Sequence, residues 1–207
     1  MSEISLWRAA EPLLLASTSA TRRALLASAA LEADTEAPGV DERSVEDSAR
    51  AAGATPEALA QELARAKALA VSHRHPGRLV LGADQTLELE GQVFHKPAHR
   101  EDARRQISAL SGRRHALHSA FALARGGAIV DESIDTAYLT VRDLSPEAVD
   151  LYLRLAGDRV LQSVGGYQVE GLGIHLFERI EGDHSTILGL PLRPLLVCLR
   201  KLDLLAF

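Results

Sequence analysis

Leu13-Leu14-Leu15-Ala16-Ser17-Thr18-Ser19-Ala20-Thr21-Arg22-Arg23 is the stretch that indicates the fold. A short apolar run ends in three hydroxyl residues, and the helix-forming run Ala24-Leu25-Leu26-Ala27 follows at once. This order predicts a strand, a polar loop and the N-terminus of a helix. Arg22 and Arg23 then fall in the first turn, where the helix dipole favours anions over cations. A bound anion would remove that conflict, so the segment indicates a phosphate site. The alternative is a serine-capped helix with two solvated arginines.

The composition limits the class of protein. The chain has 207 residues, 46% of them hydrophobic, which is enough for a sizeable core. This length suits one domain or two small lobes, and we expect a single domain over residues 1–207. The formal net charge of -5 argues against a nucleic acid polymer as partner, because such binding usually needs a basic face. The single cysteine, Cys198, cannot form an internal disulfide, so we expect a reducing, cytoplasmic setting. No apolar stretch approaches the roughly 20 residues that span a membrane, so no membrane partner is expected.

Strand and helix patterns alternate along the chain. We expect strands at Pro12–Ala16, Arg78–Asp84, Ala116–Ala124, Ala128–Val141 and Leu172–Glu178, and a hairpin over Thr86–Phe94. We expect helices at Thr21–Ala30, Pro56–His73, Glu101–Leu110 and Pro191–Leu205, and one opened by Ser145-Pro146-Glu147. Ala37–Arg43 resembles a short extended piece that enters a polar loop. Strands that alternate with helices, together with hairpins, indicate an α/β fold with a mixed sheet.

Asp84 ends an apolar run that is expected to form a strand. In open α/β sheets, ligands bind at the carboxyl ends of the strands. The carboxylate could therefore act as a general base or as a metal ligand. The alternative is an aspartate that forms a turn after the strand.

Two lysines are candidates for binding an anion. Lys67 borders the apolar face of the helix expected over Pro56–His73, so it either extends outward to solvent or reaches a buried anion. Lys96 precedes Pro97, which restricts the local backbone and would hold the lysine in place. The arginines of Ser111-Gly112-Arg113-Arg114 lie at a helix end, where the dipole favours cations without any ligand.

The segment Gly165–Gly173 is rich in glycine without matching a dinucleotide-binding fingerprint, and the chain has no Walker-type loop. It could line a pocket, with Gln168 and Glu170 as polar contacts, or be an ordinary loop before a strand. His115 and His118 lie near an expected strand, but alternation puts them on opposite faces. No Cys/His grouping suits zinc, and nothing resembles a serine or cysteine nucleophile with a poised base.

Taken together, these segments resemble the Maf family of nucleoside triphosphate pyrophosphatases, from about Leu13 to Leu196. The family's motifs correspond, in order, to Ala16–Leu26, Val40-Asp41-Glu42, Lys67, Gly82-Ala83-Asp84, His95-Lys96-Pro97, Leu110–Arg113, Glu178–Gly182 and Gly189–Leu192. Two positions depart from these motifs: Ala20 stands in place of a proline and His95 in place of a glycine. Both changes affect loop rigidity more than charge.

The resemblance implies a Maf/ITPase-like fold, with a mixed central sheet flanked by helices and two lobes with a cleft. It implies hydrolysis of a nucleoside triphosphate to the monophosphate and pyrophosphate, as house-cleaning of non-standard nucleotides. Asp84 would activate water, and Glu42 and Asp84 could bind a divalent cation, Mg²⁺ or Mn²⁺; base and metal ligand are competing roles for Asp84. The residues that would hold the triphosphate are Ser17, Ser19, Arg22, Arg23, Lys67 and Lys96. The resemblance also suggests a homodimer.

Three residues bear on which base is bound: Thr21, Gln85 and Glu170 stand where branches of the family differ, and the last two resemble the branch that acts on 7-methyl-GTP. A carboxylate accepts hydrogen bonds from the N1–H and exocyclic amine of a guanine, and the positive charge of the methylated ring favours it. A dTTP/UTP or broad-specificity enzyme is the alternative within the family. A non-catalytic nucleotide-binding regulator of cell division is the alternative of another class. The presence of Glu42, Lys67, Asp84 and Lys96 together disfavours it, because binding alone would not require both carboxylates.

Overall fold

The computed structural model of the protein describes residues 6–207. Its strands are β1 (Leu13–Ala16), β2 (Ala33–Thr35), β3 (Val80–Leu89), β4 (Gln92–Phe94), β5 (Arg114–Arg125), β6 (Ala128–Val141) and β7 (Phe177–Glu181). They hydrogen-bond in the order β2-β1-β3-β5-β6-β7, with β4 paired to β3. β1 runs parallel to β2 and β3, whereas the β3–β4 and β6–β7 pairs are antiparallel. The predicted α/β fold with a mixed sheet is confirmed.

The helices are α1 (Ala20–Ser28), α2 (Glu42–Ala51), α3 (Pro56–Arg74), α4 (Arg100–Leu110), α5 (Pro146–Ala156), α6 (His184–Ile187) and α7 (Leu192–Lys201). Short 3₁₀ turns cover Gly157–Leu161, Val164–Gly166 and Leu172–Leu176. Thr55 and Ser145 cap α3 and α5 through their hydroxyls, each with proline in the first turn, as the sequence predicts. Across the described part of the chain, no helix combines the length and apolar character needed to cross a membrane.

The chain divides into two compact units, each with its own hydrophobic core. The first unit holds the chain up to Gln85, Ser119–Asp135 and Leu188–Phe207, and the second holds Thr86–His118 and Thr136–Ile187. The long strands β3, β5 and β6 contribute residues to both units. The second core includes Leu87 of β3, Ile107 of α4 and Leu139 of β6.

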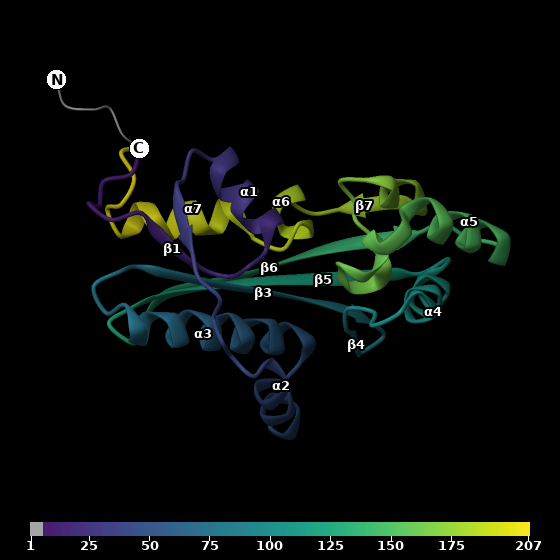
Figure 1. Ribbon diagram of the computed structural model, residues 1–207, viewed down its shortest axis with the longest axis horizontal. Helices are drawn as coiled ribbons and strands as arrows, with labels where there is room; N and C mark the ends of the chain where they lie inside the picture. Colours follow the sequence, from purple (N-terminus) through teal and green to yellow (C-terminus); the bar gives the residue numbers. More distant parts are fainter. Residues whose placement is uncertain (1–5) are drawn as a thin grey trace. The chain divides into compact units, whose positions relative to one another are not determined.

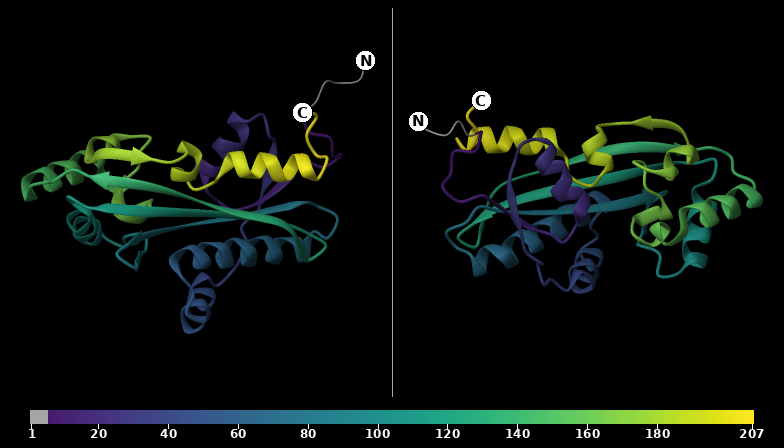
Figure 2. Two further views of the ribbon diagram at one scale, coloured as in Figure 1. Left: turned by 180° about the vertical axis from the view of Figure 1, so that it is seen from behind. Right: turned by 45° about the horizontal axis from the view of Figure 1, so that its top comes forward.

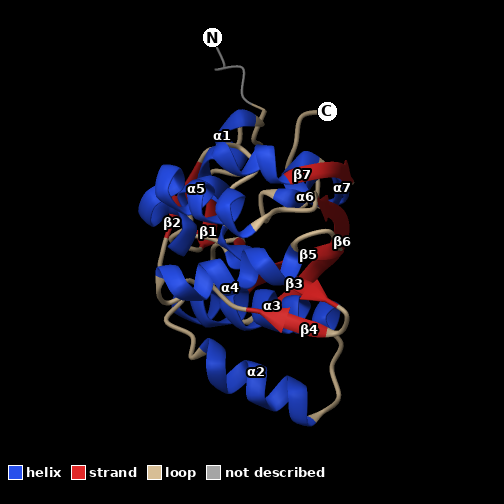
Figure 3. Cartoon of the chain, turned by 90° about the vertical axis from the view of Figure 1, so that its right-hand side faces the viewer, coloured by secondary structure: helices blue, strands red, loops and turns tan. Residues whose placement is uncertain are grey.

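In the first unit, helices cover both faces of the sheet. α3 lies along one face, while α1 and α7 lie on the other, as Figure 1 shows and the view from behind in Figure 2 confirms. Leu13 to Ala16 are all buried, so β1 is an uninterrupted apolar run, as expected for a strand covered on both faces. α2 stands beside α3 (Figure 3), and Ala49 is its one buried residue.

α3 packs closely on the sheet because small residues face each other. Ala60, Ala64 and Ala68 of α3 form one apolar cluster with alanines of β5. A Cβ added at Gly82 of β3 would lie 2.3 Å from the carbonyl oxygen of Ala64 and 2.5 Å from the amide nitrogen of Ala68. Only glycine leaves room for the α3 backbone at that position, and this contact sets the height of the neighbouring Lys67 above the sheet.

Three sequence predictions are wrong. Asp84 does not end a strand, because β3 continues through it to Leu89. The predicted strand Leu172–Glu178 is a 3₁₀ turn over Leu172–Leu176, and β7 begins only at Phe177. The extended piece expected over Ala37–Arg43, and the polar loop expected after it, give way to helix α2, which begins at Glu42. In the first case, a charged partner described below makes a carboxylate tolerable inside a buried strand.

Candidate functional site

The hydroxyl loop between β1 and α1 caps the helix, as the alternative of a serine-capped helix predicts. The Ser19 hydroxyl accepts a hydrogen bond from the Arg22 amide at 3.3 Å. The Ser17 hydroxyl in turn accepts from the Ser19 amide at 3.1 Å. Both serines are therefore held next to the open N–H groups at the start of α1, where an anion is favoured.

Arg22 is not a solvated arginine. Its Nε donates to the carbonyl oxygen of Gly189 at 2.8 Å, and its Nη1 donates to the Ser17 hydroxyl at 3.5 Å. Burial lowers the pKa of Arg22, while the charges of Asp84 and Glu42 act in the opposite direction. A guanidinium stays protonated in proteins, so this is a fixed positive charge at the start of α1. Arg23, by contrast, is exposed.

Lys67 lies between two carboxylates. Its Nζ donates to Asp84 Oδ1 and also lies 2.8 Å from Glu42 Oε1. The side chains of Lys67 and Asp84 are only 7% and 12% exposed, whereas that of Glu42 is 56% exposed. Of the two alternatives for Lys67, reaching a buried anion is confirmed, and the anion is supplied by the protein itself.

Local structure brings these three charges together. Asp84 lies two residues beyond Gly82, which pairs with Ala16 at the carboxyl end of β1. The prediction that Asp84 ends its own strand is wrong, but Asp84 lies just beyond the carboxyl end of the neighbouring parallel strand β1. Asp41 caps α2 by accepting a hydrogen bond from the Ser44 amide at 3.3 Å, which makes Glu42 the first residue of that helix.

Gln85 follows Asp84, so alternation along β3 directs it to the opposite face. Its Nε2 donates to the buried Ser119 hydroxyl at 2.8 Å. A Cβ added at Gly189 would lie 3.6 Å from Arg22 Nη2 and 3.7 Å from Gln85 Oε1. The backbone at Gly189 therefore lies beside both side chains, and its φ of +93° favours glycine. Thr21, the third position linked to base choice, is half-buried in the first turn of α1.

Sequence reasoning missed two parts of this arrangement. Nothing in the local pattern marks Ser119 as the partner of Gln85, because the two lie on different strands. The Gly189 carbonyl could have been suspected from the motif Gly189–Leu192, but a backbone acceptor leaves no side-chain signature.

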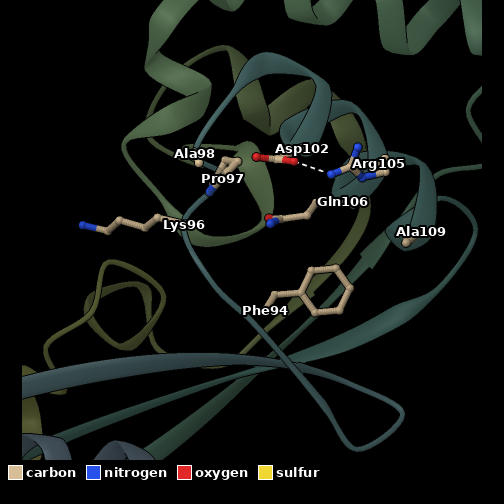
Figure 4. A pocket seen from close by; sticks show the side chains of 8 residues that line it. All are labelled: Phe94, Lys96, Pro97, Ala98, Asp102, Arg105, Gln106 and Ala109. Atoms are coloured by element: carbon tan, nitrogen blue, oxygen red, sulfur yellow. Dashed lines mark hydrogen bonds and ion pairs between the residues drawn. The ribbon is translucent and has the colours of Figure 1, made fainter. Parts of the chain in front are cut away.

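The remaining predicted site residues, Lys96 and Glu170, belong to the second unit and are both exposed. Lys96 borders a shallow pocket lined by Phe94, Lys96, Pro97, Ala98, Asp102, Arg105, Gln106 and Ala109. In Figure 4 the Lys96 side chain extends away from the other lining residues, whereas Arg105 is paired with Asp102. Lys96 has no ion-pair partner among the described residues, so its charge is available to an anion.

The fit of a divalent cation can be judged from the donors present. In residues 6–207, no group of three or more histidine, cysteine, aspartate or glutamate side chains converges as a ready-made metal cage. Glu42 and Asp84 do converge, on the Lys67 ammonium. Mg²⁺ is commonly held by one or two carboxylates together with water and substrate phosphate oxygens, so this pair fits such an ion.

The chain is similar to known proteins over most of its length. The family model described as "Maf-like protein" matches residues 12–202. The chain belongs to the Maf family. This match takes in Arg22, Glu42, Lys67 and Asp84, the charged residues that meet in the first unit.

Relatives within the Maf family are similar over their full length. A nucleoside triphosphate pyrophosphatase of Rhodopseudomonas palustris (strain HaA2) is 52% identical over 99% of this chain and 100% of its own. One from Nitrobacter winogradskyi is also 52% identical, over 98% of this chain and 100% of its own. A 7-methyl-GTP pyrophosphatase of Brucella abortus is 50% identical over 91% of this chain and 95% of its own. Among solved structures, the Staphylococcus aureus Ham1 protein matches 66% of this chain and 73% of its own, with 14% identity and a TM-score of 0.40.

Proposed function

We propose that this Maf-family protein hydrolyses a nucleoside triphosphate to the nucleoside monophosphate and pyrophosphate. The observation that carries the proposal is the pair of carboxylates, Glu42 and Asp84, gathered around one buried lysine beside the half-buried Arg22. The names of the relatives in Rhodopseudomonas and Nitrobacter support the same reaction.

Each group has a role that follows from its position. The N-terminus of α1 and the Arg22 guanidinium supply fixed positive potential for phosphate oxygens, which carry increasing negative charge as the bond to the leaving group breaks. Asp84 takes a proton from water, whose oxygen attacks the α-phosphorus. The bond from the α-phosphorus to the bridging oxygen breaks, and pyrophosphate leaves with that oxygen. Before ion and substrate bind, Lys67 holds Asp84 in place by its hydrogen bond.

We propose Glu42 and Asp84 as the protein ligands of a divalent cation, with Mg²⁺ or Mn²⁺ as the candidates. Such an ion would neutralise phosphate charge at the reacting centre. The cation competes with Lys67 for both carboxylates, so Lys67 would turn to the phosphate oxygens when the ion is bound.

Removing divalent cations is expected to reduce pyrophosphate release by about a hundredfold or more, since metal ions contribute several kcal/mol to phosphoryl chemistry. Adding Mg²⁺ back to the chelator-treated protein should restore the rate. The melting temperature should change little, because Lys67 and Arg22 already balance the charges of the two carboxylates. Undiminished turnover in excess chelator would contradict the metal proposal and leave Asp84 as base only.

The preferred base is the finer part of the proposal. We propose 7-methyl-GTP as the preferred nucleotide, with Glu170 as the residue that selects the base. The exposed Glu170 carboxylate suits the N1–H and amine donors of a guanine and the positive charge of the methylated ring. The name of the Brucella relative supports this choice, whereas the names of the other two relatives give no base.

Replacing Glu170 by glutamine is expected to lower kcat/KM for 7-methyl-GTP by about tenfold, as for the loss of one charge-assisted hydrogen bond, and to affect UTP and dTTP little. The measurement is pyrophosphate release over a panel of nucleotides. Glu101→Gln, at an exposed position in the same unit, is the matched control and should behave as the wild type. A preference for UTP or dTTP in this panel would contradict the 7-methyl-GTP proposal and would assign the protein to the dTTP/UTP branch of the family.

A further inference from the structure

The loop that carries Glu170 is held by buried aromatic side chains. This loop, Gly165–Gly173, begins with two left-handed residues, Gly165 with a φ of +77° and Gly166 with a φ of +73°. The Gly165 amide donates to Gln106 Oε1 at 3.0 Å, and the Tyr152 hydroxyl donates to the Gly166 carbonyl at 3.2 Å. The start of the loop is therefore fixed by side chains of α4 and α5.

The next residue, Tyr167, is buried and hydrogen-bonded to a histidine. Its hydroxyl lies 2.6 Å from His115 Nε2, and both residues are at most 5% exposed. The Tyr167 ring packs edge-on against Phe177, with the ring centroids 4.9 Å apart. His115 comes from the start of β5, so this contact ties the loop to the sheet of the second unit.

His115 is an unfavourable residue for packing alone. Burial lowers its pKa to about 4, so the ring is neutral at physiological pH. Within the described residues, its Nδ1 is buried without a hydrogen-bond partner. A buried nitrogen that lacks a partner costs free energy that an apolar side chain of similar size would avoid. The one hydrogen bond that the ring makes, to Tyr167, is the contact that offsets this cost.

The chain is tightly constrained between Tyr167 and Glu170. The Gly171 amide donates to the Gln168 carbonyl at 3.2 Å, which closes a turn with Glu170 inside it. A Cβ added at Gly173 would lie 2.4 Å from the Gln168 carbonyl oxygen, so the following 3₁₀ turn packs directly on the same peptide group. The position of the Glu170 backbone is therefore set by the position of Tyr167, three residues before it.

We infer that the hydrogen bond between His115 and Tyr167 is a positioning contact for substrate selectivity, because it fixes the turn from which Glu170 reads the base. Neither side chain touches the reacting phosphates in this assignment. The inference rests on the proposed function, since it concerns the base-reading role given to Glu170.

Tyr167→Phe removes one hydroxyl and keeps the ring against Phe177. The loss of this buried hydrogen bond should speed amide hydrogen exchange at Gln168–Gly171 by about tenfold or more, with exchange in α4 and α5 unchanged. The matched control is Tyr138→Phe, an exposed tyrosine of β6 in the same unit, which should leave exchange in the loop unaltered. Exchange in Tyr167→Phe equal to that of the wild type would overturn the inference without any assay of activity.

Kinetics provide the second readout. Tyr167→Phe should raise KM for the preferred nucleotide by about tenfold with a much smaller change in kcat. The reason is that the turn is displaced, while the residues proposed to bind the phosphates are unchanged. His115→Gln, whose amide can replace the Nε2 hydrogen bond, should retain most of the wild-type selectivity, whereas His115→Phe should match Tyr167→Phe. A KM unchanged in Tyr167→Phe overturns the inference alone. If the wild-type protein releases no pyrophosphate from any nucleotide, the proposed function is overturned instead. The exchange measurement then still tests whether the His115–Tyr167 hydrogen bond holds the turn.

Discussion

Replacing Asp84 by asparagine should lower pyrophosphate release by about a thousandfold or more, within the range that general-base catalysis contributes. Asparagine keeps the size and one oxygen of the side chain but can neither accept a proton from water nor carry the charge that a divalent cation requires. Both roles proposed for Asp84 are lost together. The rate of pyrophosphate release at saturating nucleotide is the measurement.

The control for this variant must separate chemistry from folding. Asp158→Asn makes the same change at an exposed position of the second unit and should retain the full rate. Asp84→Asn should fold, because its remaining oxygen still accepts a hydrogen bond from Lys67. A folded Asp84→Asn protein with a rate within tenfold of the wild type would remove Asp84 from the mechanism.

Lys67→Met should destabilise the protein by about 3 kcal/mol, because removing one partner of a buried ion pair leaves the other charge uncompensated. Methionine preserves the length and apolar stem of the side chain, so little packing is lost. Asp84 bears most of the cost, since it is 12% exposed, whereas the half-exposed Glu42 can turn to solvent. Chemical denaturation of Lys67→Met and the wild type gives the difference in unfolding free energy.

The double variant Lys67→Met/Asp84→Asn gives the decisive comparison. With the buried carboxylate neutralised, the lysine is no longer needed for charge balance, so the double variant should be more stable than Lys67→Met alone. Strictly additive losses would show that the two side chains do not interact as the structure has them. Mg²⁺ should also stabilise Lys67→Met more than the wild type, because both carboxylates are then open to the ion.

The strand, the serine cap and the start of α1 in the first unit could be predicted from the sequence, because the signal is local. Leu13 to Ala16 form a buried strand, Ser19 caps α1, and the arginines fall in its first turn. The capping interpretation and the anion-site interpretation turn out to be compatible. Capping uses the Ser19 hydroxyl, while Arg22 folds back to Gly189 and remains charged beside the helix start.

The environment of Asp84 could not be predicted, because it depends on contacts between distant segments. A carboxylate after an apolar run normally ends a strand, so the sequence favours a turn there. The structure instead continues β3, since Lys67 of α3 supplies the opposite charge. That contact depends on Gly82, whose missing side chain lets α3 approach, and nothing in the local sequence reveals this approach.

The strand predicted over Leu172–Glu178 is wrong for a related reason. Leu172, Ile174 and Leu176 place apolar side chains at alternate positions, which favours a strand. Gly173, however, packs against the Gln168 carbonyl within a 3₁₀ turn. Likewise, α2 has a single buried residue and few apolar side chains, so its sequence resembles that of a polar loop. Its start depends on the Asp41 cap, and with it the position of Glu42.

The products formed from a nucleoside triphosphate test the central claim most directly. Incubation of the wild-type protein with 7-methyl-GTP, GTP, UTP and dTTP in Mg²⁺, followed by separation of the products, should give monophosphate and pyrophosphate in equal amounts. Asp84→Asn should give neither. Release of diphosphate and inorganic phosphate, or bound nucleotide that is never cleaved, would contradict the account.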